Sequence, residues 1–227
     1  MKVWIATVLL CACGDWAAAQ VKDAGVENLG APSEVKMLAY TSISFSFTAR
    51  SADSPAWEID VKQDLSGTYR AKDGASVPII VSAATMKRLG GGDSAVGSGK
   101  CETKQKNIAQ TGSKSITYVA GDASSRCVFN YSDEGELNAA AAAFQAIAQT
   151  MQAGEKLKHD HRFDRLGLDA DLDTLTAAVK DGYAIELQNI AAILRSIVED
   201  DEVLSASRRK AKGLLDMASV QAAVSAR

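Results

Sequence analysis

The segment Thr41–Thr48 reads TSISFSFT and, from Ser42 on, alternates strictly between polar and apolar residues. A period of two with one polar face is typical of a half-buried antiparallel strand. Turn-forming residues follow at 51–55, and the sequence WEIDV at 57–61 then repeats the alternation. We therefore expect residues 41–61 to form a β-hairpin.

Further short strands are predicted on both sides of a helix. A third strand is expected over residues 68–71, and residues 77–81 lead into Ser82, a suitable N-cap for a short helix over 83–89. After a glycine-rich loop to Lys100, three more strands are expected at 106–110, 115–119 and 127–131. Three strands and a helix, followed by three strands and another helix, suggest an internal duplication. The predicted fold class is α+β, with an antiparallel sheet of about six strands.

The chain becomes helical after Tyr131. Asp133 and Glu136 have the spacing of a capping box, which predicts an alanine-rich helix that extends to about Arg165. Apolar residues at helical spacing predict three more helices. The first contains Leu172, Leu175 and Val179, and the second contains Ile190, Ile193, Leu194, Ile197 and Val198. The third is capped by Asp200 and Asp201 and contains Val203, Leu204, Ala211, Leu214 and Leu215. Because alanine buries little area, we expect the first helix to lie close on the sheet and the helices to pack there.

The N-terminus has the pattern of a cleavable signal peptide. Lys2 precedes an apolar run over residues 3–13, and Ala17–Ala19 provide an A-x-A exit before Gln20. We therefore predict cleavage between Ala19 and Gln20, and export of the protein to the periplasm or the outside of the cell.

A lipid anchor is the alternative at this end of the chain. Cys13 stands in a loose lipobox, and its acylation would tether the protein to a membrane. The expected organisation is a signal peptide at 1–19, an N-terminal arm at 20–40, a sheet domain at 41–132 and a helical region at 133–227.

Cleavage would leave two cysteines, Cys101 and Cys127. Two cysteines in an exported protein most simply pair with each other, so a disulfide is predicted. The net charge of −3 argues against a nucleic-acid partner, which usually requires a strong basic excess. No apolar stretch after the signal is long enough to cross a bilayer, so no transmembrane segment is expected there.

The strongest candidate for a metal site is the sequence HDHRFD at 159–164. His161 and Asp164 could share one face of a helix, but two ligands make only a weak site. Residues 94–101 lack the glycine and the serine or threonine of a phosphate-binding loop. No catalytic constellation and no cofactor are therefore expected.

Two resemblances add to this interpretation. The last two predicted helices resemble one HEAT-type pair, through Ile190, Leu194, Ile197, Asp201, Val203, Arg208, Ala211, Leu214 and Leu215. Because a solenoid needs at least three repeats, a single pair implies a helical hairpin. The chain also resembles a group of exported bacterial proteins of unknown function, through residues 107–112, 127–132 and 161–168. That resemblance implies a β-rich part followed by a helical part, and it implies no activity.

Two classes of function stay open. The absence of a recognisable catalytic motif favours an exported non-enzymatic protein that binds another protein or a cell-envelope ligand. The alternative is an exported enzyme or inhibitor whose site is assembled from residues scattered along the chain.

Overall fold

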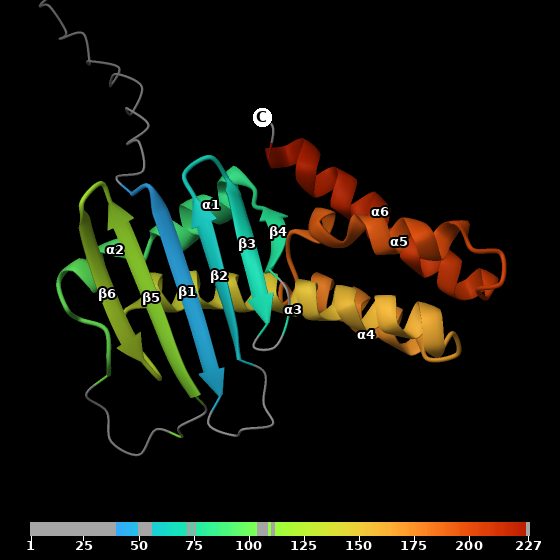
Figure 1. The fold of residues 1–227 in the computed structure, drawn as a ribbon, viewed down its shortest axis with the longest axis horizontal. Coiled ribbons are helices and arrows are strands. Elements are labelled where there is room, and N and C mark those ends of the chain that lie inside the picture. Colours follow the sequence, from blue (N-terminus) through green and yellow to red (C-terminus); the bar gives the residue numbers. More distant parts are fainter. Residues whose placement is uncertain are drawn as a thin grey trace, which may run out of the picture. The chain divides into compact units, whose positions relative to one another are not determined.

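The computed structural model describes residues 40–49, 56–71, 74, 76–103, 109 and 112–225. Six strands form one antiparallel sheet (Figure 1). They are β1 (Ser42–Ala49), β2 (Trp57–Lys62), β3 (Ser66–Ala71), β4 (Ser76–Ile80), β5 (Gly112–Ala120) and β6 (Ala123–Phe129). Their order across the sheet is β4-β3-β2-β1-β5-β6, so the strand with the clearest alternation lies inside the sheet.

The predicted α+β class and the six antiparallel strands are confirmed. The division of the strands is different from the prediction, because residues 76–80 form the edge strand β4 rather than a lead into the helix. Four strands therefore precede the first helix, and the proposed three-plus-three duplication is wrong. Of the strand predicted at 106–110, only residue 109 is described, and it has no regular secondary structure. The predicted signal peptide, the cleavage site between Ala19 and Gln20, and the arm except for Tyr40 lie outside the described residues.

The alternation of TSISFSFT places its apolar residues in the core. Ile43 and Phe45 are fully buried, and Phe45 lies opposite Ile59 of β2 and Ile116 of β5. The serines between them face the opposite side of the sheet and are partly exposed. One face of the sheet is therefore apolar, as the period of two requires.

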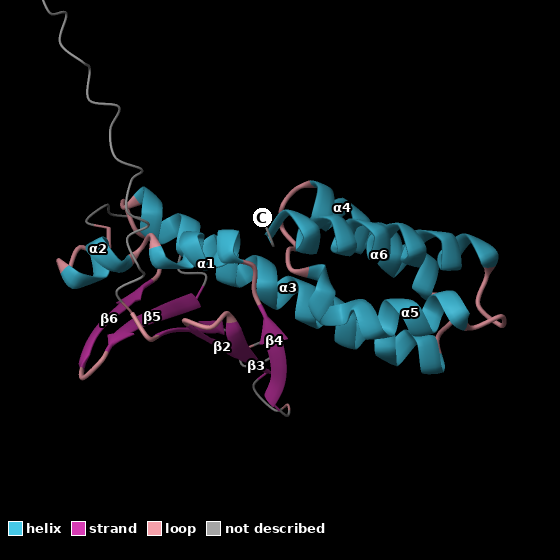
Figure 2. Ribbon diagram, turned by 90° about the horizontal axis from the view of Figure 1, so that it is seen from above, coloured by secondary structure: helices cyan, strands magenta, loops and turns pink. Residues whose placement is uncertain are grey.

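Two short helices follow β4. Ser82 caps α1 (Ala83–Gly90) as predicted, because its hydroxyl accepts a hydrogen bond of 3.1 Å from the Thr85 amide. The loop predicted after Gly90 instead contains a second helix, α2 (Asp93–Gly97). In Figure 2, α1, α2 and the first part of α3 lie on one face of the sheet, and no described element covers the other face.

The long helix α3 (Gly135–Phe163) crosses the apolar face of the sheet. The ring of Phe144 stacks on that of Phe45, with centroids 4.9 Å apart. The predicted capping box is wrong: the N-cap is Glu134, without a side-chain cap bond, and the Asp133 carboxylate accepts a hydrogen bond from the Thr103 hydroxyl instead.

The second half of α3 extends beyond β4 and packs with the remaining helices (Figure 1). These are α4 (Leu168–Lys180), the 3₁₀ turn η1 (Leu187–Ile190), α5 (Ala191–Glu199) and α6 (Ser205–Ser225). The last helix begins after Val203 and Leu204, later than predicted, because the Asp200 carboxylate accepts a hydrogen bond from the Glu202 amide and closes a turn there. Among the described residues, no helix has both the length and the hydropathy needed to cross a membrane.

Candidate binding groove

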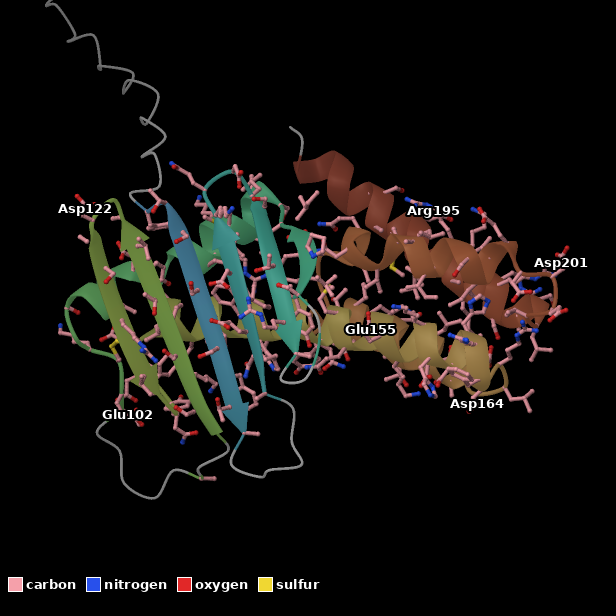
Figure 3. The ribbon with its side chains drawn as sticks, viewed as in Figure 1. Glu102, Asp122, Glu155, Asp164, Arg195 and Asp201 are labelled. Carbon is pink, nitrogen blue, oxygen red and sulfur yellow. A yellow bond between two sulfur atoms is a disulfide. The ribbon has the colours of Figure 1, made fainter. Side chains whose placement is uncertain are left out.

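A groove of about 350 Å³ lies where the helices meet the edge of the sheet. We call it the α3–α5 groove. It is lined by Val77, Met151, Gly154, Glu155, Lys158, Asn189, Ile190, Ala192, Ile193 and Ser196. Figure 3 shows the side chains of this region and labels Glu155 on α3 and Arg195 on α5.

Two helices form the long walls of the groove. The α3 wall consists of residues 151, 154, 155 and 158, which share one face because they are three or four positions apart. The α5 wall consists of residues 192, 193 and 196. Most of the inner surface is apolar, and the charged groups of Glu155 and Lys158 lie at the rim, with 61 % and 70 % of their side chains exposed.

Gly154 allows the floor of the groove to form. A Cβ atom at this position would lie 2.4 Å from Cγ2 of Ile190, which is closer than two non-bonded carbon atoms can approach. Only glycine therefore lets η1 come this near to α3. The contact is the reason for a glycine in the middle of a long helix, where it otherwise costs stability.

Side chains of η1 attach the helical region to the edge of the sheet. The Asn189 amide pairs with both backbone groups of Ile80, accepting from its N–H at 2.8 Å and donating to its C=O at 3.0 Å. The side-chain amide of Gln188 also donates to the Ile80 carbonyl. In effect, the side chain of Asn189 takes the place of a neighbouring strand at this point, which blocks an otherwise open sheet edge.

A buried carboxylate fixes the segment that leads into η1. Glu186 is 5 % exposed and has a left-handed backbone, with φ of 61°. Its carboxylate accepts hydrogen bonds from the amide of Ser82 at 3.0 Å and from its hydroxyl at 2.7 Å. The Thr150 hydroxyl donates to the Ile185 carbonyl at 2.7 Å. These bonds hold the groove in one geometry.

An ionic cluster lies on another face of α3, against α4. The Lys156 ammonium is 2.7 Å from an Asp160 oxygen and also contacts the Asp171 carboxylate. Nδ1 of His159 lies 2.8 Å from the other Asp160 oxygen. Lys156 and Asp171 also line a separate cavity of about 240 Å³.

The two carboxyl groups of this cluster have pKa values shifted in opposite directions. The hydrogen bonds with Asp171 and then with Lys156 lower the pKa of Asp160. Burial, followed by the hydrogen bond with Asp160, raises the pKa of Asp171. Within the described part of the chain, no group of three or more His, Cys, Asp or Glu residues is arranged to hold a metal ion.

The predicted candidates His161 and Asp164 are not brought together. Nε2 of His161 lies 2.9 Å from the Asp200 carboxylate, which links the last turn of α3 to the α5–α6 loop. The Asp164 carboxylate accepts a hydrogen bond of 3.1 Å from the Gly167 amide and belongs to a turn. Each side chain thus has a partner in the connections between helices.

Cys101 and Cys127 lie at the distance of a disulfide, with their Cα atoms 5.9 Å apart. That separation is within the range that a disulfide allows. Cys127 belongs to β6, and Cys101 follows α2, so a bond would join this connection to an edge strand. Cys13, the alternative site of lipidation, lies outside the described residues.

A second apolar surface lies at the far end of the helical region. Phe163 at the end of α3 is 66 % exposed, Leu166 of the α3–α4 loop is 81 % exposed, and Leu204 of the α5–α6 loop is 55 % exposed. Arg165 joins the two loops through its ion pair with Asp200, at 3.3 Å. These side chains are exposed at the end of α3 and in two loops, whereas the α3–α5 groove is concave.

The sequence reasoning did not identify the groove. Its lining comes from β4, α3, η1 and α5, and Ile80 and Asn189, which join these parts, are 109 positions apart. The one local signal was Gly154, an isolated glycine inside a long helical pattern. No family model matches the chain, and no curated protein or solved structure is significantly similar to it.

Proposed function

We propose that this is an exported, non-enzymatic binding protein that holds an apolar part of a cell-envelope partner in the α3–α5 groove. The observation that carries the proposal is the groove itself, an apolar concavity of about 350 Å³ with a few polar groups at its rim. Sites with this composition are the usual places where proteins bind ligands. Hydrogen bonds also hold the floor of the groove in place, because Asn189 bonds to Ile80 and Glu186 bonds to Ser82.

Two features support export. The sequence begins with a signal-peptide pattern. In addition, Cys101 and Cys127 lie close enough to form a disulfide, a bond that persists in oxidising compartments.

The ionic cluster supports a second candidate function, that of an enzyme. Two carboxyl groups with oppositely shifted pKa values can serve as a general acid and a general base. Asp171 lines a cavity of about 240 Å³ that could admit a small substrate. We favour binding because Lys156 contacts both carboxylates and joins α3 to α4, which gives the cluster a structural role.

A dye titration tests the proposal. We expect 8-anilinonaphthalene-1-sulfonate to bind the wild-type protein at one saturable site, because apolar concavities bind such dyes. The Ala192→Trp variant, which fills the groove from its rim, should bind the dye at least about tenfold more weakly, equal to about 1.4 kcal/mol.

Arg195→Trp is the matched control, because Arg195 is exposed on the same helix and does not line the groove. It should bind the dye as the wild type does. Equal binding by all three proteins would contradict the proposal. If binding or turnover of a small substrate depended on Asp171 and not on Ala192, that result would support the second candidate function, an enzyme.

A further inference from the structure

Building on the proposed function, we infer that the α3–α5 groove takes an amphipathic α-helix of a partner protein, and not an extended segment. The inference rests on the shape of the groove walls and on the state of the neighbouring sheet edge.

The walls have the spacing of a helix-binding surface. Along α3, the lining runs from Met151 to Lys158, which is two turns or about 10 Å of helix axis. A helix that lies between two others inserts side chains at i, i+3, i+4 and i+7, and these span the same two turns. The groove thus offers a position for an additional helix beside α3 and α5.

The volume sets the number of side chains that can enter. At about 350 Å³, the groove is near the lower end of the range of ligand pockets, which is about 300–1,000 Å³. It has room for a few apolar side chains. Because the lining residues Met151 and Ile190 are buried and apolar, these side chains should be aliphatic or aromatic.

The sheet edge beside the groove is closed to an extended segment. Strand addition requires free backbone N–H and C=O groups along the edge strand. Both groups of Ile80 are already bonded by Asn189, and Pro78 has no N–H to donate. A peptide in extended form would therefore find few partners along β4 where it meets the groove.

The rim fits a helix with charges of both signs. On the α3 wall, Glu155 and Lys158 form an exposed ion pair, with 3.9 Å between the Lys158 ammonium nitrogen and a Glu155 carboxylate oxygen. Such a pair contributes little to stability, so each member is available to pair with an incoming side chain. A partner helix with an apolar stripe flanked by acidic and basic residues matches this arrangement.

Two matched pools of 16-residue fluorescent peptides test the inference. Both pools have the same composition, but one carries apolar residues at i, i+3, i+4 and i+7, and the other alternates apolar and polar residues. Binding is measured by fluorescence anisotropy after selection on the wild-type protein. The best helical-pattern peptides should bind at least tenfold more tightly than the best alternating ones. They should also lose at least tenfold in affinity for Ala192→Trp, and not for Arg195→Trp.

The outcomes separate this inference from the proposed function. If alternating peptides bind the groove as tightly, or if only the dye binds it, the helix inference is wrong and the binding groove stands. If helical peptides bind all three proteins equally, they occupy another surface and the inference is again wrong. If neither the peptides nor the dye depend on Ala192, the proposed function fails as well.

Discussion

The substitution Gly154→Ala tests the closest contact beneath the groove. In the interior of a helix, this change alone stabilises by about 0.8–1.0 kcal/mol. Here the new methyl group would lie 2.4 Å from Cγ2 of Ile190, so the backbone of η1 must shift. Overpacking of this kind costs about 1–3 kcal/mol. The net expectation is a change between about zero and a loss of about 2 kcal/mol in the free energy of unfolding.

Gly213→Ala is the matched control. Gly213 lies inside α6, and a Cβ atom there would meet nothing within 4 Å. This variant should gain up to about 1 kcal/mol, so the two alanine substitutions should differ by the overpacking cost of about 1–3 kcal/mol. Urea denaturation followed by circular dichroism measures both values.

A double-mutant cycle identifies the contact. Ile190→Leu keeps the volume of the side chain and removes the branch at Cβ that Gly154 faces. In this background, Gly154→Ala should be less destabilising, with a coupling of about 1 kcal/mol. If Gly154→Ala stabilised the wild-type protein as much as Gly213→Ala does, the close approach of η1 to α3 would be refuted.

Three other expectations concern the hydrogen bonds between Glu186 and Ser82, the ionic cluster and the two cysteines. Glu186→Ala removes the acceptor of two hydrogen bonds from Ser82 and should lower the free energy of unfolding by about 3 kcal/mol, whereas an unchanged value in urea denaturation would exclude a role for this carboxylate. The pKa of Asp160 is lowered from 3.8 in the folded protein, so its contribution to stability is present above pH 3.8 and is lost as the pH falls through the folded pKa. The raised pKa of Asp171 affects the free energy of unfolding in the opposite sense, and only above pH 3.8. Below pH 3.8, the Asp160→Asn variant should therefore lose less stability with falling pH than the wild type. If the free energy of unfolding fell equally steeply with pH in both proteins, the proposed role of the cluster would be wrong. Reduction of a bond between Cys101 and Cys127, which are 26 positions apart, should cost about 3–4 kcal/mol, and alkylation of two free thiols in the unreduced protein would show that no such bond exists.

The fold class could be predicted because local patterns determined it. The alternation of residues 41–48 has one explanation, a strand with one buried face, and the structure places that strand inside the sheet. The strand β4 was missed because Pro78 and the nearby Ser82 suggested a connection into the helix. Proline is tolerated there because β4 lies at the edge of the sheet.

The details that failed depend on contacts between distant residues. The predicted capping box does not form, and the Asp133 carboxylate instead accepts a hydrogen bond from Thr103, which lies 30 positions away. His161 was considered as a metal ligand because of its neighbours in sequence, but its partner in the structure is Asp200, 39 positions away. The groove could not be predicted at all, because its lining residues come from four separate elements and no single segment of the chain contains them.

Methyl-resolved NMR tests the central claim, that apolar ligands bind in the α3–α5 groove, most directly. The isoleucine and leucine methyl groups are observed while 8-anilinonaphthalene-1-sulfonate is added. The groove residues Ile190 and Ile193 should show the largest shifts, and the exposed Leu166 and Leu204 at the far end should stay in place. The largest shifts at Leu166 and Leu204, with Ile190 and Ile193 unchanged, would contradict the claim and assign binding to the far end of the helical region.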